Sequence, residues 1–205
     1  ARIGVMPRSG SARDVRWFEV APCYVFHPMN AYDDGATLVL DVVRHPRVFD
    51  RERLGPDEAA STLVRWTVDL HAGTVREEQV NDQAQEFPRV DERLVGRRYR
   101  YGYALALNPD AVRRGARPPS DTVLKHDRVR GTTARRSFGE GRQVSEFVFI
   151  PHAPDAAEDD GVLMGFVSDL TTDRTDLMLL DAGSLERVAA IHFPTRVPAG
   201  FHGNW

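Results

Sequence analysis

Short runs of alternating apolar and polar residues, typical of half-buried β-strands, recur along the whole chain. Segments 24–32 and 37–43 are joined by Asp33-Asp34-Gly35, a turn sequence that strongly favours a β-hairpin. Segments 63–70 and 75–80 form a second such pair. Further strands are expected at residues 15–20, 99–107, 123–129, 133–138, 146–150, 162–170, 176–181 and 188–193. The pattern therefore predicts an all-β protein.

Helical patterns are scarce. One or two helical turns are expected within 56–63 and one turn within 110–114, while loops are expected at 44–60, 109–121 and 153–160. Strands that recur every ~8–12 residues are typical of a sandwich, a barrel or a propeller. Because the sequence contains no tight repeat, its period alone does not single out a propeller.

Composition narrows the class of protein. The 205 residues are 41% hydrophobic, which is enough for a sizeable core, and the lone Cys23 excludes an internal disulfide. A net charge of −3 gives no global reason to bind nucleic acid or an anionic membrane. The basic stretch 113–142 lacks interleaved aromatic residues, which favours solvated loop faces over a nucleic-acid site. No apolar run is long enough for a membrane-spanning helix.

The amino-terminal residues lack the features of a signal peptide. The chain also begins without methionine, inside an expected strand, which predicts that another part of the protein precedes it.

Two of the seven histidines lie in unusual surroundings. His27 is in an apolar strand directly before Pro28, which cannot donate to a central ladder, so the strand must end, bulge or reach an edge there. His202 lies between Gly200 and Gly203, which permit a tight backbone. A rigidly held imidazole is a common metal ligand, but each local context favours a histidine satisfied by a carbonyl or carboxylate. The other five histidines are expected to be solvated or structural.

Two glutamates raise a similar question. Glu86 and Glu146 each stand at the start of an apolar segment, where a carboxylate is costly unless it has a partner. That partner is either an arginine or the free N–H of a metal-bound histidine. Local context alone favours the arginine.

Five segments together resemble the carotenoid cleavage oxygenase family, which includes carotenoid, apocarotenoid and lignostilbene dioxygenases and the retinal pigment epithelium isomerase. They occur in the family's order and span nearly the whole chain. The segments are Phe26-His27-Pro28-Met29-Asn30-Ala31-Tyr32, Glu86-Phe87-Pro88-Arg89-Val90, Ser145-Glu146-Phe147-Val148-Phe149, Glu158-Asp159-Asp160-Gly161 and Phe201-His202-Gly203-Asn204-Trp205.

The resemblance implies a seven-bladed β-propeller with a non-haem Fe(II) on its axis, bound by four histidines. His27 matches the third ligand position of the family and His202 the fourth. Glu86 and Glu146 match two of the glutamates that hydrogen-bond such ligands, and we expect Glu86 to pair with His27 and Glu146 with His202. Because cis ligands at ~2.1 Å from one metal lie close together, the two imidazole nitrogens should be about 3 Å apart.

The resemblance also implies an activity, in which O2 cleaves a C=C bond of a carotenoid, apocarotenoid or stilbene to give two carbonyl compounds. The iron and O2 carry out the bond cleavage, so no catalytic residue beyond the metal ligands is expected. The substrate-binding residues are not identified. Two alternatives stay open: a retinoid isomerohydrolase of the same fold, and a non-catalytic propeller that serves as a binding module.

At about 40–60 residues per blade, 205 residues build roughly three to four blades. Residues 1–205 are therefore expected to be the C-terminal portion of a single propeller domain. The N-terminal half, which carries the other two ligands in the family, is then a required partner. An apolar conjugated substrate and O2 are the other expected partners, and nucleic acid is not. The expected location is cytoplasmic, with peripheral membrane contact left open.

Overall fold

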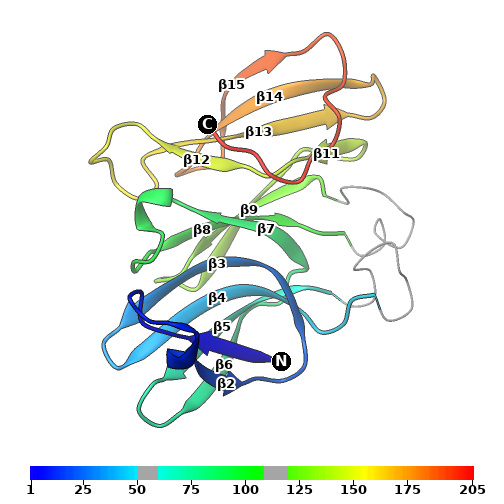
Figure 1. Ribbon diagram of the computed structural model, residues 1–205. Helices are drawn as coiled ribbons and strands as arrows, with labels where there is room; N and C mark the ends of the chain where they lie inside the picture. Colours follow the sequence, from blue (N-terminus) through cyan, green and yellow to red (C-terminus); the bar gives the residue numbers. More distant parts are fainter. Residues whose placement is uncertain (50–59, 109–119) are drawn as a thin grey trace.

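The computed structural model describes residues 1–49, 60–108 and 120–205. These residues form three antiparallel sheets and a two-stranded hairpin, with only two short 3-10 helices (Figure 1). Within these ranges, no helix is long and apolar enough to cross a membrane. The predicted all-β architecture is confirmed.

Each sheet is a meander of strands that follow one another in the chain, and we call the three sheets the first, second and third blades. The first blade has the order β3-β4-β5-β6. Its strands are β3 (Tyr24–Asp34), β4 (Thr37–His45), β5 (Thr62–Asp69) and β6 (Thr74–Asn81). The turn between β3 and β4 places Gly35 at a φ of +66°, a backbone conformation that favours glycine, as the hairpin sequence predicts.

The second and third blades repeat this plan. The second has the order β7-β8-β9-β10, and in the third both β11 and β12 pair with β13, followed by β14 and β15. The strands of the second blade are β7 (Gln85–Val90), β8 (Tyr101–Ala106), β9 (Thr122–Asp127) and β10 (Thr132–Ser137). Those of the third are β11 (Arg142–Val144), β12 (Val148–Pro151), β13 (Gly161–Asp169), β14 (Arg174–Asp181) and β15 (Arg187–His192).

The remaining elements are short. Strands β1 (Arg2–Val5) and β2 (Arg16–Glu19) form the amino-terminal hairpin, with a 3-10 helix at Ala12–Asp14 between them. The second 3-10 helix, Glu92–Leu94, lies in the β7–β8 connection.

All of the strands predicted from the pattern are present, and the differences lie at their ends. Strand β4 continues to His45, so the first two residues of the predicted loop 44–60 belong to the strand. Most of the helix predicted in 56–63, and all of the one in 110–114, lies outside the described residues. The described end of the first segment is not helical, because β5 begins at Thr62. Glu146 precedes β12 instead of lying within it.

Pro28 distorts β3 as predicted. The register between β3 and β4 shifts on both sides of Pro28, between Val25 and Pro28 and again between Pro28 and Asn30. The missing N–H of proline is accommodated by this irregularity inside a long strand. The distortion lies next to His27 and so affects where its side chain points.

The apolar core lies between the blades. Between the first and second blades, Met29 of β3 packs in one cluster with Val90 and Tyr99. The contact is close: a Cβ atom at Gly102 of β8 would lie 2.3 Å from the sulfur of Met29. A side chain at this position would have to displace the flexible end of Met29, so Gly102 leaves room for Met29 to pack against β8.

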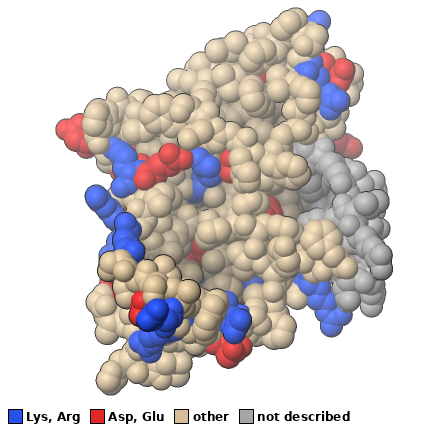
Figure 2. All heavy atoms as spheres, in the orientation of Figure 1, with Lys and Arg blue, Asp and Glu red and all other residues tan. Residues whose placement is uncertain are grey.

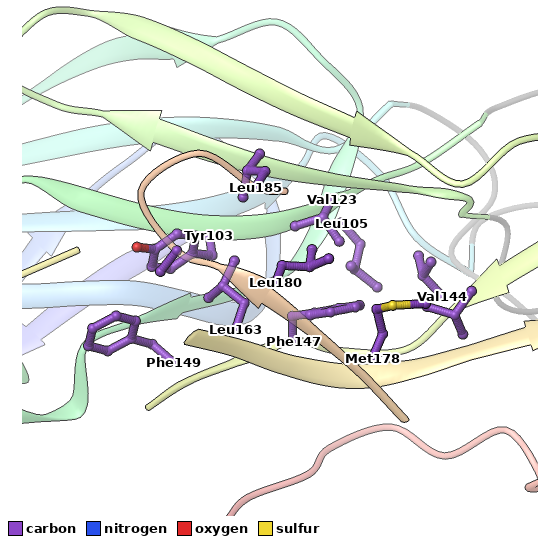
Figure 3. Close-up of a cluster of buried hydrophobic side chains, with 12 residues drawn as sticks. Tyr103, Leu105, Val123, Val144, Phe147, Phe149, Leu163, Met178, Leu180 and Leu185 are labelled. Atoms are coloured by element: carbon purple, nitrogen blue, oxygen red, sulfur yellow. The ribbon is translucent and has the colours of Figure 1, made fainter. Parts of the chain in front are cut away.

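A larger cluster joins the second and third blades. Tyr103, Leu105 and Val123 of the second blade meet apolar side chains of the third (Figure 3). The side chains that the third blade contributes include Val144, Phe147, Phe149, Leu163, Val167, Met178 and Leu180. Because side chains alternate across a strand, the neighbours of these residues point to the opposite face of the third blade.

The two outer flanks of the stack differ. On the first blade, the amino-terminal hairpin covers the flank, with Ile3 and Phe18 packed against Val42, Val64 and Trp66. On the third blade, the half-buried Met164, Phe166 and Leu177 face away from the second blade, and 56% of Ile191 is exposed. Radially stacked sheets with apolar faces are the architecture of a β-propeller, and this stack is open at one end.

Charged side chains on the face shown in Figure 2 lie mainly toward its edges, in small groups of both signs. The ion pairs of the described chain include Arg98 with Asp34 and Arg89 with Glu92. Uncharged surface covers most of the centre of that face.

A buried polar network joins the first and second blades. His126 of β9 contacts the Gln85 Oε1 atom at 2.8 Å and the Thr133 hydroxyl at 2.9 Å, and only 2% of it is exposed. Asn81 at the end of β6 donates to the same hydroxyl and accepts from Gln85. Burial lowers the pKa of His126 to about 4, so the folded protein holds this imidazole neutral.

This network predicts acid destabilisation. The pKa of His126 is lower in the folded chain than in the unfolded one, so its stabilisation is complete above pH ~6.5 and is lost as pH falls toward 4. The effect should be about 3 kcal/mol in the free energy of unfolding. His126→Gln should remove about this much of the pH dependence, measured by urea unfolding at pH 7 and pH 4. Equal pH dependence in the variant and the wild type would contradict the assignment.

Candidate metal centre

The inner strands of the first two blades, β3 and β7, lie against each other and carry the first pair of candidate residues. His27 is on β3, beside the irregularity at Pro28, and Glu86 is on β7. The Nδ1 atom of His27 lies 2.7 Å from the Oε2 atom of Glu86. This is the predicted pairing, and it orients the other ring nitrogen of His27, Nε2, away from the carboxylate.

The second pair comes from the far end of the chain. His202 lies beyond β15 in an irregular segment that is anchored on β14 by a hydrogen bond from the Val197 N–H to the Thr175 hydroxyl. The Nδ1 atom of His202 is 3.2 Å from Oε1 of Glu146, and the N–H of Gly203 donates to Oε2 of Glu146 at 3.0 Å. The pairing of Glu146 with His202 is again the predicted one.

The two Nε2 atoms face each other at 3.2 Å. If each neutral imidazole donates its Nδ1 proton to its glutamate, both Nε2 atoms present lone pairs to one point. Two lone pairs at this separation repel unless a cation or a proton lies between them. The separation is also close to the predicted value of about 3 Å for two cis ligands. The donor set therefore fits a divalent transition metal bound by imidazole nitrogens.

Phe87 shapes this arrangement. Its ring stacks on His27 with a centroid distance of 5.4 Å and meets His202 edge-on at 5.9 Å. Phe87 has a φ of +55°, which a bulky residue rarely adopts, at a point where the register between β7 and β8 shifts. In this conformation its N–H donates to Glu86 Oε2 at 2.7 Å. The strained backbone thus places a donor on the carboxylate and an aromatic ring on both imidazoles.

His27 and Glu86 each shift the pKa of the other. Hydrogen bonding to Glu86 raises the pKa of His27, and burial opposes this to a lesser extent. Burial raises the pKa of Glu86, but hydrogen bonds from His27, His45 and the Phe87 N–H together hold it below its usual value. Glu86 is therefore an ionised acceptor in spite of its burial.

The sequence patterns did not single out two residues that complete this site. His45 is buried at the end of β4, and its Nε2 atom lies 2.7 Å from Glu86 Oε1. Extending the alternation of this strand by two residues beyond Val43 would have placed His45 on the same buried face as Val43. Arg89 lies 3.7 Å from Glu146, so both partners considered for that glutamate, an arginine and a histidine, are present.

The other histidines lie elsewhere. His71 is exposed, His126 belongs to the network between the blades, and His152 and His192 each pair with one aspartate at the surface. Among the described residues, no group of three or more histidine, cysteine or acidic side chains is placed to hold a metal. The described part of the chain thus supplies two candidate ligands, His27 and His202.

A cavity of about 270 Å³ adjoins His202 and Glu146. It lies between the carboxy-terminal segment and the open face of the third blade. Glu146 and His202 line it together with the apolar Met164, Phe166 and Leu177. A largely apolar space therefore reaches the imidazole of His202 from this side.

Glu86 accepts three hydrogen bonds, and this predicts a stability effect. Glu86→Gln replaces one acceptor oxygen with a donor that faces an N–H, so the free energy of unfolding should fall by about 1–3 kcal/mol. Glu78→Gln is the matched control, because the side chain of Glu78 is 52% exposed and pairs with the exposed Arg76. The control should change stability by less than ~0.5 kcal/mol. Urea unfolding of the two variants measures the difference, and equal effects would refute the role given to Glu86.

Known proteins resemble the whole of this chain. The family model for retinal pigment epithelial membrane protein matches residues 1–205. The carotenoid cleavage oxygenase of Mycobacterium tuberculosis is 46% identical over 210 residues, covering 100% of this chain and 42% of that protein. The lignostilbene-alpha,beta-dioxygenase isozyme III of Sphingomonas paucimobilis is 34% identical, covering 99% and 46%. The isoeugenol monooxygenase of Pseudomonas putida is 31% identical, covering 99% and 45%.

Solved structures agree. The crystal structure of cobalt-substituted Synechocystis apocarotenoid oxygenase (ACO) superposes with a TM-score of 0.87 at 28% identity, covering 100% of this chain and 43% of that one. An ACO/RPE65 chimera gives a TM-score of 0.86 at 27% identity with the same coverage. The chain spans less than half the length of these relatives, so its three blades and hairpin are part of a propeller, as predicted. On the match of its full length, the chain belongs to the retinal pigment epithelial membrane protein family, the family of the carotenoid cleavage oxygenases.

Proposed function

We propose that the full-length protein is a non-haem Fe(II) dioxygenase that cleaves a C=C bond of a conjugated apolar substrate. The substrate class is a carotenoid, an apocarotenoid or a stilbene, as the names of the relatives suggest. In the overall reaction, the alkene and one O2 give two carbonyl compounds, with one oxygen atom in each.

The observation that carries the proposal is the pair of facing imidazoles. His27 and His202 turn their Nε2 atoms toward each other at 3.2 Å, and each Nδ1 atom lies on a carboxylate. Carboxylates in this position fix the tautomer of a metal-binding histidine and strengthen it as a ligand. The solved structure of cobalt-substituted ACO adds support, since that relative takes cobalt.

Each residue then has a role. His27 and His202 would hold the iron through Nε2, while Glu86 and Glu146 hold the protons on the two Nδ1 atoms. Iron supplies, when bound, the one-electron chemistry that lets O2 react with an alkene. Phe87 covers both imidazoles with an apolar ring, which keeps water from that side. No side chain of the described chain is needed as a general acid or base.

The rest of the full-length protein has two tasks in this proposal. It supplies the remaining metal ligands, because the described residues contribute only His27 and His202. It also covers the open face of the third blade, where Ile191 is exposed. We assign both tasks to an N-terminal half that precedes residue 1, which makes residues 1–205 the C-terminal portion of one propeller domain.

Metal analysis of full-length variants tests the site. Loss of a residue that hydrogen-bonds a metal ligand typically weakens metal binding by roughly 10–100-fold. His27→Ala and His202→Ala each remove a ligand itself and should weaken iron binding by more than this. Both should lose cleavage of carotenoids, apocarotenals and stilbenes, measured as O2 uptake with release of two carbonyl products. His152→Ala is the control, since this exposed histidine pairs with Asp160 at the surface and lies outside the candidate centre. Full iron content and turnover in either site variant would refute the assignment. Substrate conversion without O2 uptake would favour an isomerohydrolase instead.

The 205-residue chain alone should be a poor enzyme. Its third blade exposes apolar side chains, so the isolated chain should aggregate or remain folded only when the rest of the protein is supplied. Size-exclusion chromatography and anaerobic Fe(II) titration measure this for the chain alone and for the chain co-expressed with the preceding part. A stable monomer that binds one tight iron and turns over substrate would contradict the proposal.

A further inference from the structure

We propose that His45 is a positioning residue that fixes Glu86 and, through it, the orientation and tautomer of His27. This inference rests on the proposed function only in taking His27 as a metal ligand. His45 is 1% exposed, and its ring meets Phe26 edge-on at 5.1 Å. Its Nε2 atom is 2.7 Å from Glu86 Oε1.

The two oxygens of Glu86 are both engaged. Oε1 accepts from His45, and Oε2 accepts from His27 Nδ1 and from the N–H of Phe87, all at 2.7 Å. A carboxylate held at both oxygens cannot rotate about its last bond without losing short hydrogen bonds. The position of the acceptor for His27 is therefore set from the first blade, by the end of β4.

The hydrogen bonds that link His45, Glu86 and His27 fix which ring nitrogen of each histidine carries a proton. An ionised carboxylate only accepts, so His45 must donate from Nε2 and His27 from Nδ1. This leaves the Nε2 lone pair of His27 directed at His202. It also leaves Nδ1 of His45 without a hydrogen-bond partner in the described part of the chain, although that atom is buried. An unpaired buried nitrogen is costly, so a hydrophobic residue would be the more stable choice if His45 only filled space.

Among the described residues, Glu146 has no second imidazole donor comparable to His45. Glu146 is 3.2 Å from His202, 3.0 Å from the Gly203 N–H and 3.7 Å from Arg89. The side chain of His202 is 52% exposed, whereas that of His27 is 27% exposed. The hydrogen bond from His45 thus gives His27 a more firmly held carboxylate than the one that His202 contacts.

The test uses the full-length protein with Co2+ as the probe metal. His45→Phe keeps a ring of similar shape but removes the donor, and should raise the dissociation constant for Co2+ by roughly tenfold. His45→Gln restores an N–H donor and should stay within about threefold of the wild type. In the metal-free protein, 15N NMR should find His27 protonated on Nδ1 in the wild type and a mixture of tautomers in His45→Phe.

His126→Phe is the matched control, because His126 is also buried and hydrogen-bonds Gln85, the neighbour of Glu86. It should lower stability but leave the affinity for Co2+ unchanged. An unchanged affinity in His45→Phe, or an equal loss in His126→Phe, would overturn the proposal. So would wild-type spectra in which His45 is protonated on Nδ1 instead of Nε2, a result that does not depend on whether a variant folds. If the wild type bound no metal, the proposed function would fail, while the tautomers of His27 and His45 would still decide this inference.

Discussion

Each blade has two apolar faces, and a sheet of this kind is stable only when both faces are covered. This constraint explains most of the structure. The first and second blades share one core around Met29, and the second and third share another around Leu105. The amino-terminal hairpin covers the far side of the first blade. Among the described residues, the carboxy-terminal segment covers the far side of the third blade only in part, and Ile191 there is 56% exposed. The length of the relatives agrees with a ring that continues beyond this blade.

The same stacking creates the candidate metal centre. When blades pack face to face, their inner strands meet near one line, and here β3 and β7 bring His27 onto Glu86. Burial in such a place is expensive for a carboxylate, and Glu86 remains ionised because three donors converge on it. The features that stabilise the charge also orient the imidazole, so stability and site geometry depend on the same hydrogen bonds.

Sequence reasoning predicted the strands, the Asp33-Asp34-Gly35 turn and the distortion at Pro28, because each of these follows from local chemistry. It also paired Glu86 with His27, but only through a resemblance to a family, since no local pattern joins residues 59 positions apart. His45 and the positive φ of Phe87 were missed. The alternation of β4, extended by two residues, gives the face of His45, but its contact with Glu86 depends on how two blades meet. The positive φ of Phe87 accompanies a register shift between β7 and β8, which alternation within one strand does not report. The cytoplasmic location stays a prediction.

The distance along the chain between the two imidazoles has a consequence for folding. Within each blade, strands pair with their neighbours in sequence, so these contacts are local and are expected to form early. His27 and His202 are separated by 175 residues and meet only after three blades have docked. Closing so large a loop is entropically costly, and contacts of this kind form late. The three sheets therefore form before the candidate metal centre does. Intermediates with native sheets would still lack the two facing nitrogens.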